Sequence, residues 1–450
     1  MYFLGVLFIA LGISVSIALH EVGHLIWAKK FGVKVTHYMV GFGPTIWSRT
    51  RGETEYGLKA VPLGGFIRMI GMFPPKPGAD PSMLRASSTG RFSQLMDQAR
   101  QESMEQVKQG DEDRVFYKLS APKKLVVMLG GPTMNLIIAA VLLGGIFVFY
   151  GVGGLTSRVS SVSQCVQTIP ANGKAPAACS PSDPQAPANV AGIRPGDRIV
   201  SMAGQPVSNW DDVRALVRPN GGRRIPVVVE RGGRRLTLTA TPILNNVPRV
   251  DSQGNLVPGP DGKAIIDRVG FLGLSPSWEI VKQPVTAVPA LVGNQVAATA
   301  GVVFRIPQKM SGIIKAAFGG GVRDPNGPMS VVGVGRVAGE VADGQLSLGV
   351  TGSSSGSSKF VVLISLIASL NLALFVFNLI PLLPLDGGHA AGALWEGLKR
   401  QVARLRGRPD PGYVDVAKAL PVAYAMSIAL IGMSVLLIYA DVVNPMKLGG

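Results

Sequence analysis

Four long stretches of this chain contain no charged side chain, and this feature constrains the fold more than any other. A helix that crosses a bilayer needs about 20 predominantly apolar residues, and each stretch is long enough. The sequence therefore predicts a polytopic α-helical membrane protein with four transmembrane helices. The stretches are Met1 to His20, Leu125 to Ser157, the run between Lys359 and Asp386, and the run between Lys418 and Asp441.

Composition agrees with a membrane protein. Hydrophobic residues make up 47% of the 450 residues and charged residues only 16%, whereas soluble domains are about 25% charged. This balance excludes a wholly soluble chain and a disordered one. Two cysteines are too few for a cysteine-rich zinc fold. The first stretch could be a cleaved signal peptide, but it lacks a positively charged start and a small-residue cleavage site.

The orientation follows from the basic residues, which number 44 against 27 acidic residues. Loops rich in lysine and arginine stay in the cytoplasm, so the N-terminus, the segment from about Gly154 to Ser358 and the C-terminus are expected outside the inner (plasma) membrane. The sequence has no basic patch interleaved with aromatics, so a nucleic-acid partner is not expected. The basic residues that decide the orientation are Lys29, Lys30, Lys34, Lys123, Lys124, Lys399, Arg400, Arg404, Arg406 and Arg408.

The cytoplasmic segment after the first helix has an unusual pattern. Residues 31–75 contain short alternating runs broken by glycine and proline, which predict a membrane-associated β-region. Residues 76–122 read as a polar cytoplasmic loop, in which Phe92 to Val107 is either an amphipathic helix or a solvated surface segment. The predicted units around the helices are 1–30, 123–153, 359–389 and 419–441, with a cytoplasmic loop at 390–418 and a tail at 442–450.

The segment between the second and third helices is expected to hold a linker at 154–189, an α+β core at 190–243 and an interfacial segment at 244–358. The run GIRPGDRI at 192–199, followed by two strand-like runs, resembles the PDZ domains of bacterial membrane proteases, whose sheets can bind an extended peptide at an edge. A spacer domain with an occluded groove is the alternative. Cys165 and Cys179 lie in the linker, where an oxidising compartment favours a disulfide over two free thiols.

The motif His20-Glu21-Val22-Gly23-His24 carries the strongest chemical signal. Histidines four residues apart fall on one face of a helix and can hold one Zn²⁺, and the glutamate between them can act as the general base toward a metal-bound water. A charged residue within a membrane span costs about 2.5–3.5 kcal/mol, so its place in a span argues for a function. Solvated side chains at a helix end are the alternative.

A catalytic zinc site needs a third protein ligand, and Asp386 is the candidate. The third apolar stretch ends in LIPLLPLDGGH, where Pro381 and Pro384 must break the helix. Both motifs lie at the ends of spans that run inward, so they meet at a similar depth. His20 lies about 24 Å along a helix that starts near Leu4, which places the site in the cytoplasmic third of the membrane.

With these motifs the chain resembles the site-2 proteases, the intramembrane zinc metalloproteases, and in particular the bacterial regulator of sigma-E protease type with one PDZ domain. The run Gly130 to Asn135 resembles the GPxxN stretch of that family, and Pro62 to Phe66 resembles its membrane-associated β-region. The ending Asp441 to Pro445 is similar to actinobacterial members. The chain departs from the family pattern in the run Gly130-Gly131-Pro132, where Ala-Gly-Pro is common, and in the cysteine-bearing segment.

The resemblance implies hydrolysis of a peptide bond in the membrane-spanning part of single-pass proteins, such as anti-sigma factors that a site-1 protease has already trimmed. One Zn²⁺ per chain would lie on His20, His24 and Asp386, with Glu21 as the base. Asn135 and Asn378 are candidates for holding the substrate strand or the oxyanion, and helix–helix hydrogen bonding is the alternative for both. His389 is a candidate for orienting a ligand, with a satisfied interfacial histidine as the alternative, and His37 is expected to be structural.

Two other classes of protein stay open at this point. A zinc transporter or a metal-dependent scaffold would also bury histidine and aspartate but would not need Glu21 as a base, and an inactive PDZ adaptor would keep its partners after Glu21→Gln. The ligand set of two histidines and an aspartate also accepts other first-row metals. The sequence does not name the substrate, the cleaved bond or the oligomeric state.

Overall fold

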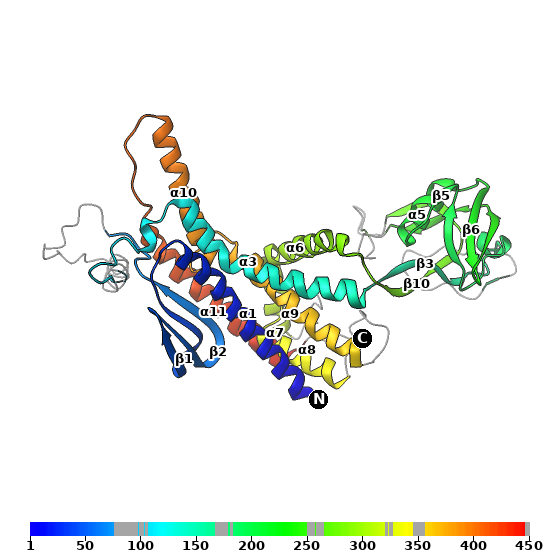
Figure 1. The fold of residues 1–450 in the computed structure, drawn as a ribbon. Helices are drawn as coiled ribbons and strands as arrows, with labels where there is room; N and C mark the ends of the chain where they lie inside the picture. The colour runs from blue at the N-terminus through cyan, green and yellow to red at the C-terminus, as the bar shows by residue number, and fades with distance from the viewer. Residues whose placement is uncertain are drawn as a thin grey trace. The chain divides into compact units, whose positions relative to one another are not determined.

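The computed structural model describes residues 1–75, 98, 103, 107–166, 179–180, 183–249, 257, 265–319, 323, 327–344 and 356–445. Most of the segment 92–107, for which an amphipathic helix is one expectation, lies outside these residues. The Gly/Ser-rich run 352–358 is expected to be a flexible linker; its residues 352–355 also lie outside, whereas 356–358 begin a helix. The chain divides into two compact units (Figure 1). Unit 1 combines Met1–Gly151 with Lys282–Gly450, and unit 2 is Val152–Val281.

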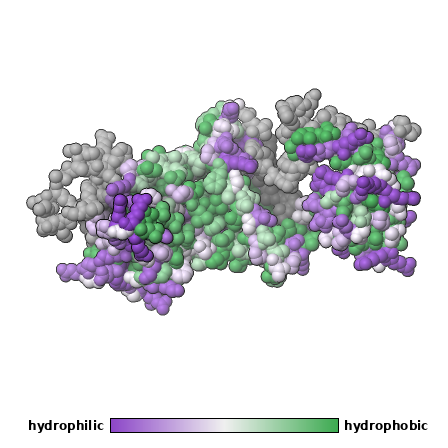
Figure 2. Space-filling model, turned by 90° about the horizontal axis from the view of Figure 1, so that it is seen from above, coloured by the Kyte–Doolittle hydropathy of each residue, from purple (hydrophilic) through white to green (hydrophobic). Residues whose placement is uncertain are grey.

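Five helical segments in the described part of the chain are long and apolar enough to cross a membrane, one more than the sequence analysis expects. Hydrophobic residues gather over the helices of unit 1 (Figure 2). The additional segment was overlooked although Gln283 to Phe304 contains no charged residue. The segments are formed by α1 (Tyr2–Lys30), α3 (Ala121–Gly145) with the π-helix η2 (Ile146–Tyr150), η4 (Val285–Ala287) with α6 (Val288–Phe304), α9 (Gly356–Asn378), and η5 (Val416–Ala419) with α11 (Leu420–Val443).

Contacts between the long helices fix their directions. The His24 ring bonds to the Val127 carbonyl and the His20 ring to Asn135, so α1 and α3 run in opposite directions. The Asn371 amide of α9 donates to Ser16 of α1 at 2.8 Å. Asp386, which follows α9, lies beside His20, which comes later in α1 than Ser16, so α1 and α9 run in the same direction. The ends of α1 and α9 therefore meet at one end of the bundle.

The additional helix α6 forms a hairpin with α7 (Ile306–Phe318). A Cβ on Gly144, at the end of α3, would contact Val288, the first residue of α6. Phe318, the last residue of α7, stacks on Tyr439 near the end of α11 with ring centroids 5.3 Å apart. Because α3 and α11 both start at the end of the bundle where α1 stops, the hairpin leaves and returns at the opposite end.

Helix α8 (Val331–Asp343) closes the end of the bundle where α1 begins. Gly5 of α1 lies so close to the Ala338 carbonyl that a Cβ there would overlap it, which is the small-residue packing typical of membrane helices. Before α8, the backbone N–H of Ser330 donates to Asp441 of α11 at 2.7 Å, and Arg323 forms a buried ion pair with the same carboxylate. The described residues between 288 and 343 therefore pack into unit 1, where the sequence analysis expected an interfacial segment without a defined fold.

The expected β-region is present as β1 (Val35–Arg51) and β2 (Thr54–Met69), which pair antiparallel with several bulges (Figure 1). Both strands bend, so one stretch of β1 has two neighbours: Tyr38 pairs with Tyr56 on one side and with Ile67 on the other. The Tyr38 hydroxyl donates to the Ala18 carbonyl at 2.8 Å, which joins the sheet to α1.

Unit 2 is wider than the predicted core at 190–243. Its six-stranded sheet has the order β10-β3-β4-β6-β7, with β5 beside β4, and β8 pairs with β9. Strands β3 and β10 come from the expected linker and interfacial segment, and β3 pairs with backbone groups of β4 that an edge strand would leave unpaired. The elements are β3 (Val152–Val162), α4 (Pro187–Val190), β4 (Arg198–Met202), β5 (Gln205–Pro206), α5 (Trp210–Val217), β6 (Ile225–Arg231), β7 (Arg234–Ala240), β8 (Ile243–Pro248), β9 (Ile266–Phe271) and β10 (Leu274–Val281).

The GIRPGDRI run has a local structural reason. Gly192 and Gly196 adopt φ of +77° and +91°, a region that side chains with a Cβ rarely enter. Asp197 is fully buried and accepts from the backbone N–H of Arg194 at 2.8 Å and from two nitrogens of Arg231 at 2.7 Å. Although burial raises the pKa of Asp197, these hydrogen bonds outweigh it and hold the pKa below its usual value.

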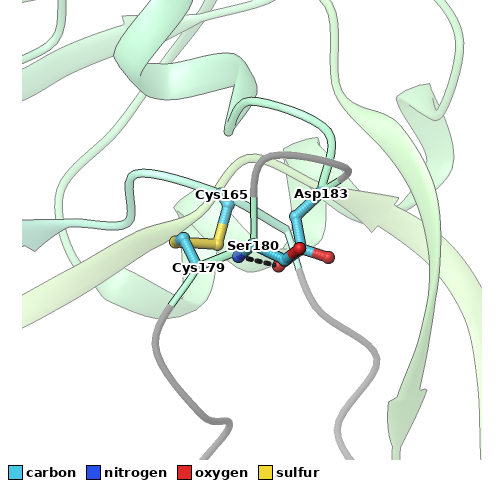
Figure 3. The surroundings of a disulfide bond; sticks show 4 residues. All are labelled: Cys165, Cys179, Ser180 and Asp183. Carbon is cyan, nitrogen blue, oxygen red and sulfur yellow. Dashed lines mark hydrogen bonds between the residues drawn. A yellow bond between two sulfur atoms is a disulfide. The ribbon is translucent and has the colours of Figure 1, made fainter.

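The disulfide predicted between Cys165 and Cys179 is present, with the two Cα atoms 5.9 Å apart (Figure 3). The backbone of Cys165 also forms an isolated bridge with Gln185, and the N–H of Ser180 donates to Asp183 at 2.8 Å. The bond therefore ties the chain that follows β3 to the chain that leads into α4.

Candidate metal centre

The two histidines of the HExxH motif face α3 because glycines allow the two helices to touch. A Cβ on Gly23 would overlap the Gly130 carbonyl, and a Cβ on Gly130 would overlap the Gly23 carbonyl. His20 and His24 therefore lie against the α3 backbone, with their Nε2 atoms 3.2 Å apart. The residue at position 23 must consequently be small, because a side chain there would hold the two helices apart.

The third expected ligand lies with the histidines although it is 362 residues further along the chain. Helix α9 ends at Asn378, as the prolines predict, and α10 (Asp386–Leu405) begins with Asp386 itself. The Asp386 Oδ2 atom lies 3.2 Å from His20 Nε2 and 3.3 Å from His24 Nε2. One potential ligand atom from each of the three residues thus falls within 4.8 Å of the others.

The arrangement fits a metal ion by two structural criteria. Asp386 Oδ2 is buried without a hydrogen-bond partner, although it points at two imidazole nitrogens. A Cβ on Gly131 would overlap the Nε2 atoms of both histidines, so this glycine leaves open the space in front of the three ligand atoms. Two imidazoles and one carboxylate form the donor set of an open catalytic zinc site.

The outer nitrogens of both histidines are also held. His24 Nδ1 lies 2.7 Å from the Val127 carbonyl, which fixes the tautomer that leaves Nε2 free for a metal. His20 Nδ1 lies 3.0 Å from the amide of Asn135, whose Oδ1 is buried without a partner. Rotating that amide by half a turn lets Oδ1 accept from His20 Nδ1–H and satisfies both groups. Asn135 of α3 therefore bonds to a candidate ligand on α1, which is a contact between helices of the kind that the sequence analysis gave as the alternative to substrate or oxyanion binding.

Glu21 lies between the two histidines in the sequence and faces the sheet. Its carboxylate accepts a hydrogen bond from the backbone N–H of Ile67 in β2. A Cβ on Gly65 would lie 3.2 Å from Glu21 Cγ, so a larger residue there would crowd the carboxylate. The second half of β2 therefore borders the site, a contact that sequence patterns do not reveal.

The other candidate residues have different surroundings. Asn378 ends α9, and its role stays a prediction. His389 lies one turn after Asp386 and is not part of the ligand group, while His37 lies 3.5 Å from Glu55 within the sheet. Asn371, which the sequence analysis missed, is fully buried and links α9 to α1. Its position two turns before Asn378, in an otherwise apolar helix, is the signal that could have identified it.

Comparison with known proteins agrees with this geometry. Residues 8–417 match the model of "Peptidase family M50". The chain is 34% identical to "Zinc metalloprotease Rip1" of Mycobacterium tuberculosis over 456 residues, which cover 100% of this chain and 99% of that protein. It is 31% identical to the protein of the same name from Mycolicibacterium smegmatis over 465 residues, with the same shares covered.

The fold and the site thus define an integral membrane metallopeptidase with a zinc cofactor, the class to which these relatives belong. The chain belongs to peptidase family M50, the site-2 protease family. Members of this family act on membrane-bound substrates in the bilayer, which agrees with a site built from helices of the bundle.

Proposed function

We propose that this chain is an intramembrane endopeptidase that cleaves single-pass membrane proteins, of the anti-sigma-factor kind, within or near their transmembrane segment. In this proposal a site-1 protease first trims the substrate outside the membrane, and the second cut serves stress signalling by regulated intramembrane proteolysis. One observation carries the proposal: His20, His24 and Asp386 meet beside Glu21 among the apolar helices of unit 1. The relatives named as zinc metalloproteases support it.

The roles of the side chains follow from their contacts. Zn²⁺ held by His20, His24 and Asp386 supplies Lewis acidity toward a peptide carbonyl and makes water more acidic. Glu21 accepts the proton of the attacking water and returns it to the leaving amide nitrogen. The hydrogen bond from Ile67 N–H keeps the Glu21 carboxylate in place, and Asn135 and Val127 keep the two imidazoles oriented.

The directions of the helices support a chain that crosses the membrane four times, although five of the described segments are long and apolar enough to do so. Because α1 and α9 run in the same direction and α3 runs in the opposite one, the chain must return to the same side between Tyr150 and Gly356. The α6–α7 hairpin meets this condition without crossing. With the basic residues on the inside, the N-terminus and unit 2 lie outside and the metal site lies toward the cytoplasm.

The sheet has an exposed edge on which an unwound segment of a helical substrate could pair as an added strand. This edge is not the stretch that the alternating sequence pattern favours. Leu58 pairs with both Val40 and Trp47, so the stretch 58–61, which the alternating pattern favours as a docking edge, begins in the interior of the sheet. The stretch from Gly65 to Met69 is an edge among the described residues, and it borders Glu21. We place the substrate strand on this edge, because an added strand gains main-chain hydrogen bonds there.

The main experiment compares the wild type with Glu21→Gln. Both proteins are purified in membranes, their zinc content is measured, and each is mixed with a trimmed single-pass reporter. We expect cleavage by the wild type alone and equal zinc in both proteins. Equal zinc without cleavage in either protein would instead support a transporter or scaffold.

The edge is tested with Ile67→Pro, which removes one outward N–H, and with Ile67→Val as the matched control that keeps it. Proline is tolerated at an edge position because no ladder hydrogen bond is lost. Because the Ile67 N–H also holds Glu21, a short peptide that is already extended reports on the base separately. We expect Ile67→Pro to retain zinc and cleavage of this peptide, and to lose most cleavage of the full-length reporter. Loss of both cleavages would assign the effect to Glu21 instead. Equal cleavage by the two variants would contradict this role of the edge.

Unit 2 is proposed to be a PDZ-type filter that excludes substrates with an intact outer domain. Val152 and Val281 pair with each other at the two ends of the unit, so a short Gly/Ser linker can replace everything between them. We expect this deletion to permit cleavage of untrimmed reporter while cleavage of trimmed reporter continues. Unchanged selectivity would exclude the filter.

A further inference from the structure

Helix α10 continues well beyond the metal site and changes its surroundings along its length. Its first half packs on α3, where Glu396 is buried and bonds to Lys124 at 2.7 Å. From Leu394 onward, large apolar side chains face outward, and Leu398 and Leu405 are 52% and 80% exposed. The exposed apolar residues of this part of the helix are Leu394, Trp395, Leu398, Val402 and Leu405.

A groove of about 420 Å³ lies between the second half of α10 and the chain that follows it. The groove is lined mainly by apolar side chains and also by three basic residues. The Lys399 ammonium lies over the Trp395 ring at 5.5 Å from the ring centroid. The groove is lined by Trp395, Leu398, Lys399, Val402, Ala403, Arg406, Arg408, Pro409 and Pro411.

The charge around this groove is positive and is not cancelled locally. Among the described neighbours, Glu396 is engaged by Lys124 and Arg400, and Asp410 lies 3.4 Å from Arg400. The groove residues Lys399, Arg406 and Arg408 are all exposed. The end of the molecule that carries α10 shows hydrophilic residues beside hydrophobic ones (Figure 2).

We propose that this groove binds an anionic phospholipid of the cytoplasmic leaflet, with its phosphate among Lys399, Arg406 and Arg408 and its acyl chains along the apolar wall. Apolar walls beside basic residues suit a lipid better than a free phosphate, which would need no apolar surface. Tryptophan with lysine and arginine is also the pattern of side chains at a membrane interface. The groove lies at the end of the bundle where α1 ends in Lys29 and Lys30.

The proposal gives the lipid an influence on the metal site. Asp386 is the first residue of the helix whose second half forms the groove, and the helix between them is continuous. A lipid that holds the second half of α10 at the membrane surface therefore restricts the orientation of Asp386. This consequence rests on the proposed peptidase function, whereas lipid binding does not.

The binding test uses full-length protein in phosphatidylcholine vesicles with and without phosphatidylglycerol. Brominated lipids quench nearby tryptophan, and the signal of Trp395 is obtained by subtracting that of Trp395→Phe, because the chain has 5 tryptophans. Each basic side chain near an anionic surface changes partitioning by about fivefold. We expect brominated phosphatidylglycerol to quench Trp395 more than brominated phosphatidylcholine does, and the triple variant Lys399→Gln/Arg406→Gln/Arg408→Gln to reduce this preference about tenfold or more.

The matched control is Arg223→Gln/Arg224→Gln/Arg234→Gln, which removes three exposed charges from unit 2. Equal quenching by the two lipids in wild-type protein would overturn the proposal. If the α10 variant instead raises KM for a reporter with an acidic cytoplasmic segment and keeps its lipid preference, the groove binds substrate and the proposal is wrong. Selective quenching without any cleavage would leave the lipid site standing and refute only the proposed function.

Discussion

Gly131→Ala should empty the metal site, although it adds only one methyl group to a helix. The new Cβ would lie 2.6 Å from His20 Nε2 and closer still to His24 Nε2, whereas ordinary contact begins at 3.4 Å. His20 Nε2 must therefore retreat by roughly 0.8 Å. Zinc sites tolerate changes in ligand distance of only about 0.2 Å, so both imidazoles move out of range.

The expected loss of zinc affinity is large. Removing a residue that merely orients a ligand costs about 10- to 100-fold in affinity, and here two ligands themselves are displaced. We therefore expect a loss above about 100-fold, which corresponds to more than about 2.7 kcal/mol of binding free energy. A weakened helix cannot account for it, because alanine stabilises a helix by about 0.5–1 kcal/mol relative to glycine.

Gly145→Ala is the matched control, since it lies in the same helix and its Cβ would meet nothing within 4 Å. Both variants are equilibrated at graded concentrations of free zinc, and bound metal is measured by atomic emission together with cleavage of the reporter. We expect the Gly145 variant to behave as wild type and the Gly131 variant to lose zinc and activity together. Wild-type zinc affinity in Gly131→Ala would refute the geometry of the site.

Three further predictions concern contacts outside the ligand group. Asn135→Leu should lower zinc affinity about 10- to 100-fold, whereas Asn135→Asp, which still accepts from His20 Nδ1–H, should retain it in the same metal titration. Asp197→Asn should destabilise unit 2 by about 2 kcal/mol in hydrogen exchange of the full-length protein, because Arg231 loses a charged partner. Since the folded pKa of Asp197 is lowered, wild type should keep this contribution above about pH 4 and lose it as the pH falls further, and the variant should show no such loss. Cys165→Ser should cost unit 2 about 3 kcal/mol in the same experiment, and unchanged exchange would show that the loop is closed by other contacts.

The sequence predicts that His20, His24 and Asp386 come together because each part of the group has a local signature. The spacing of His20 and His24 places them on one helical face, and Pro381 and Pro384 end α9 before Asp386. Both outcomes depend on residues within a few positions of each other. The disulfide was also predicted, since only two cysteines are present.

Structural features that depend on residues far apart in the chain could not be predicted from the sequence in this way. The buried pair of Lys124 and Glu396 joins residues 272 positions apart, and in the sequence both look like ordinary cytoplasmic charges. Hydropathy does not distinguish a crossing helix from an arm of a hairpin, so α6 needed its contacts with Gly144 to be placed. Strand order follows pairing rather than propensity, so the alternating pattern at 58–61 does not reveal that this stretch begins inside the sheet.

Three sets of contacts together explain how Asp386 is held without a continuous helix before it. A Cβ on Gly387 would overlap the Ile380 carbonyl and one on Gly388 would lie 2.5 Å from the Leu383 nitrogen, so two glycines let the broken segment pack on the first turn of α10. Ten residues on, the buried pair of Glu396 and Lys124 ties α10 to α3, the helix that also orients both histidines. A buried ion pair adds little net stability, but losing one partner costs about 3–5 kcal/mol, so it fixes the register of the two helices. The position of the third ligand therefore depends on α10 as a whole, and whatever restrains its far end also acts on the metal site.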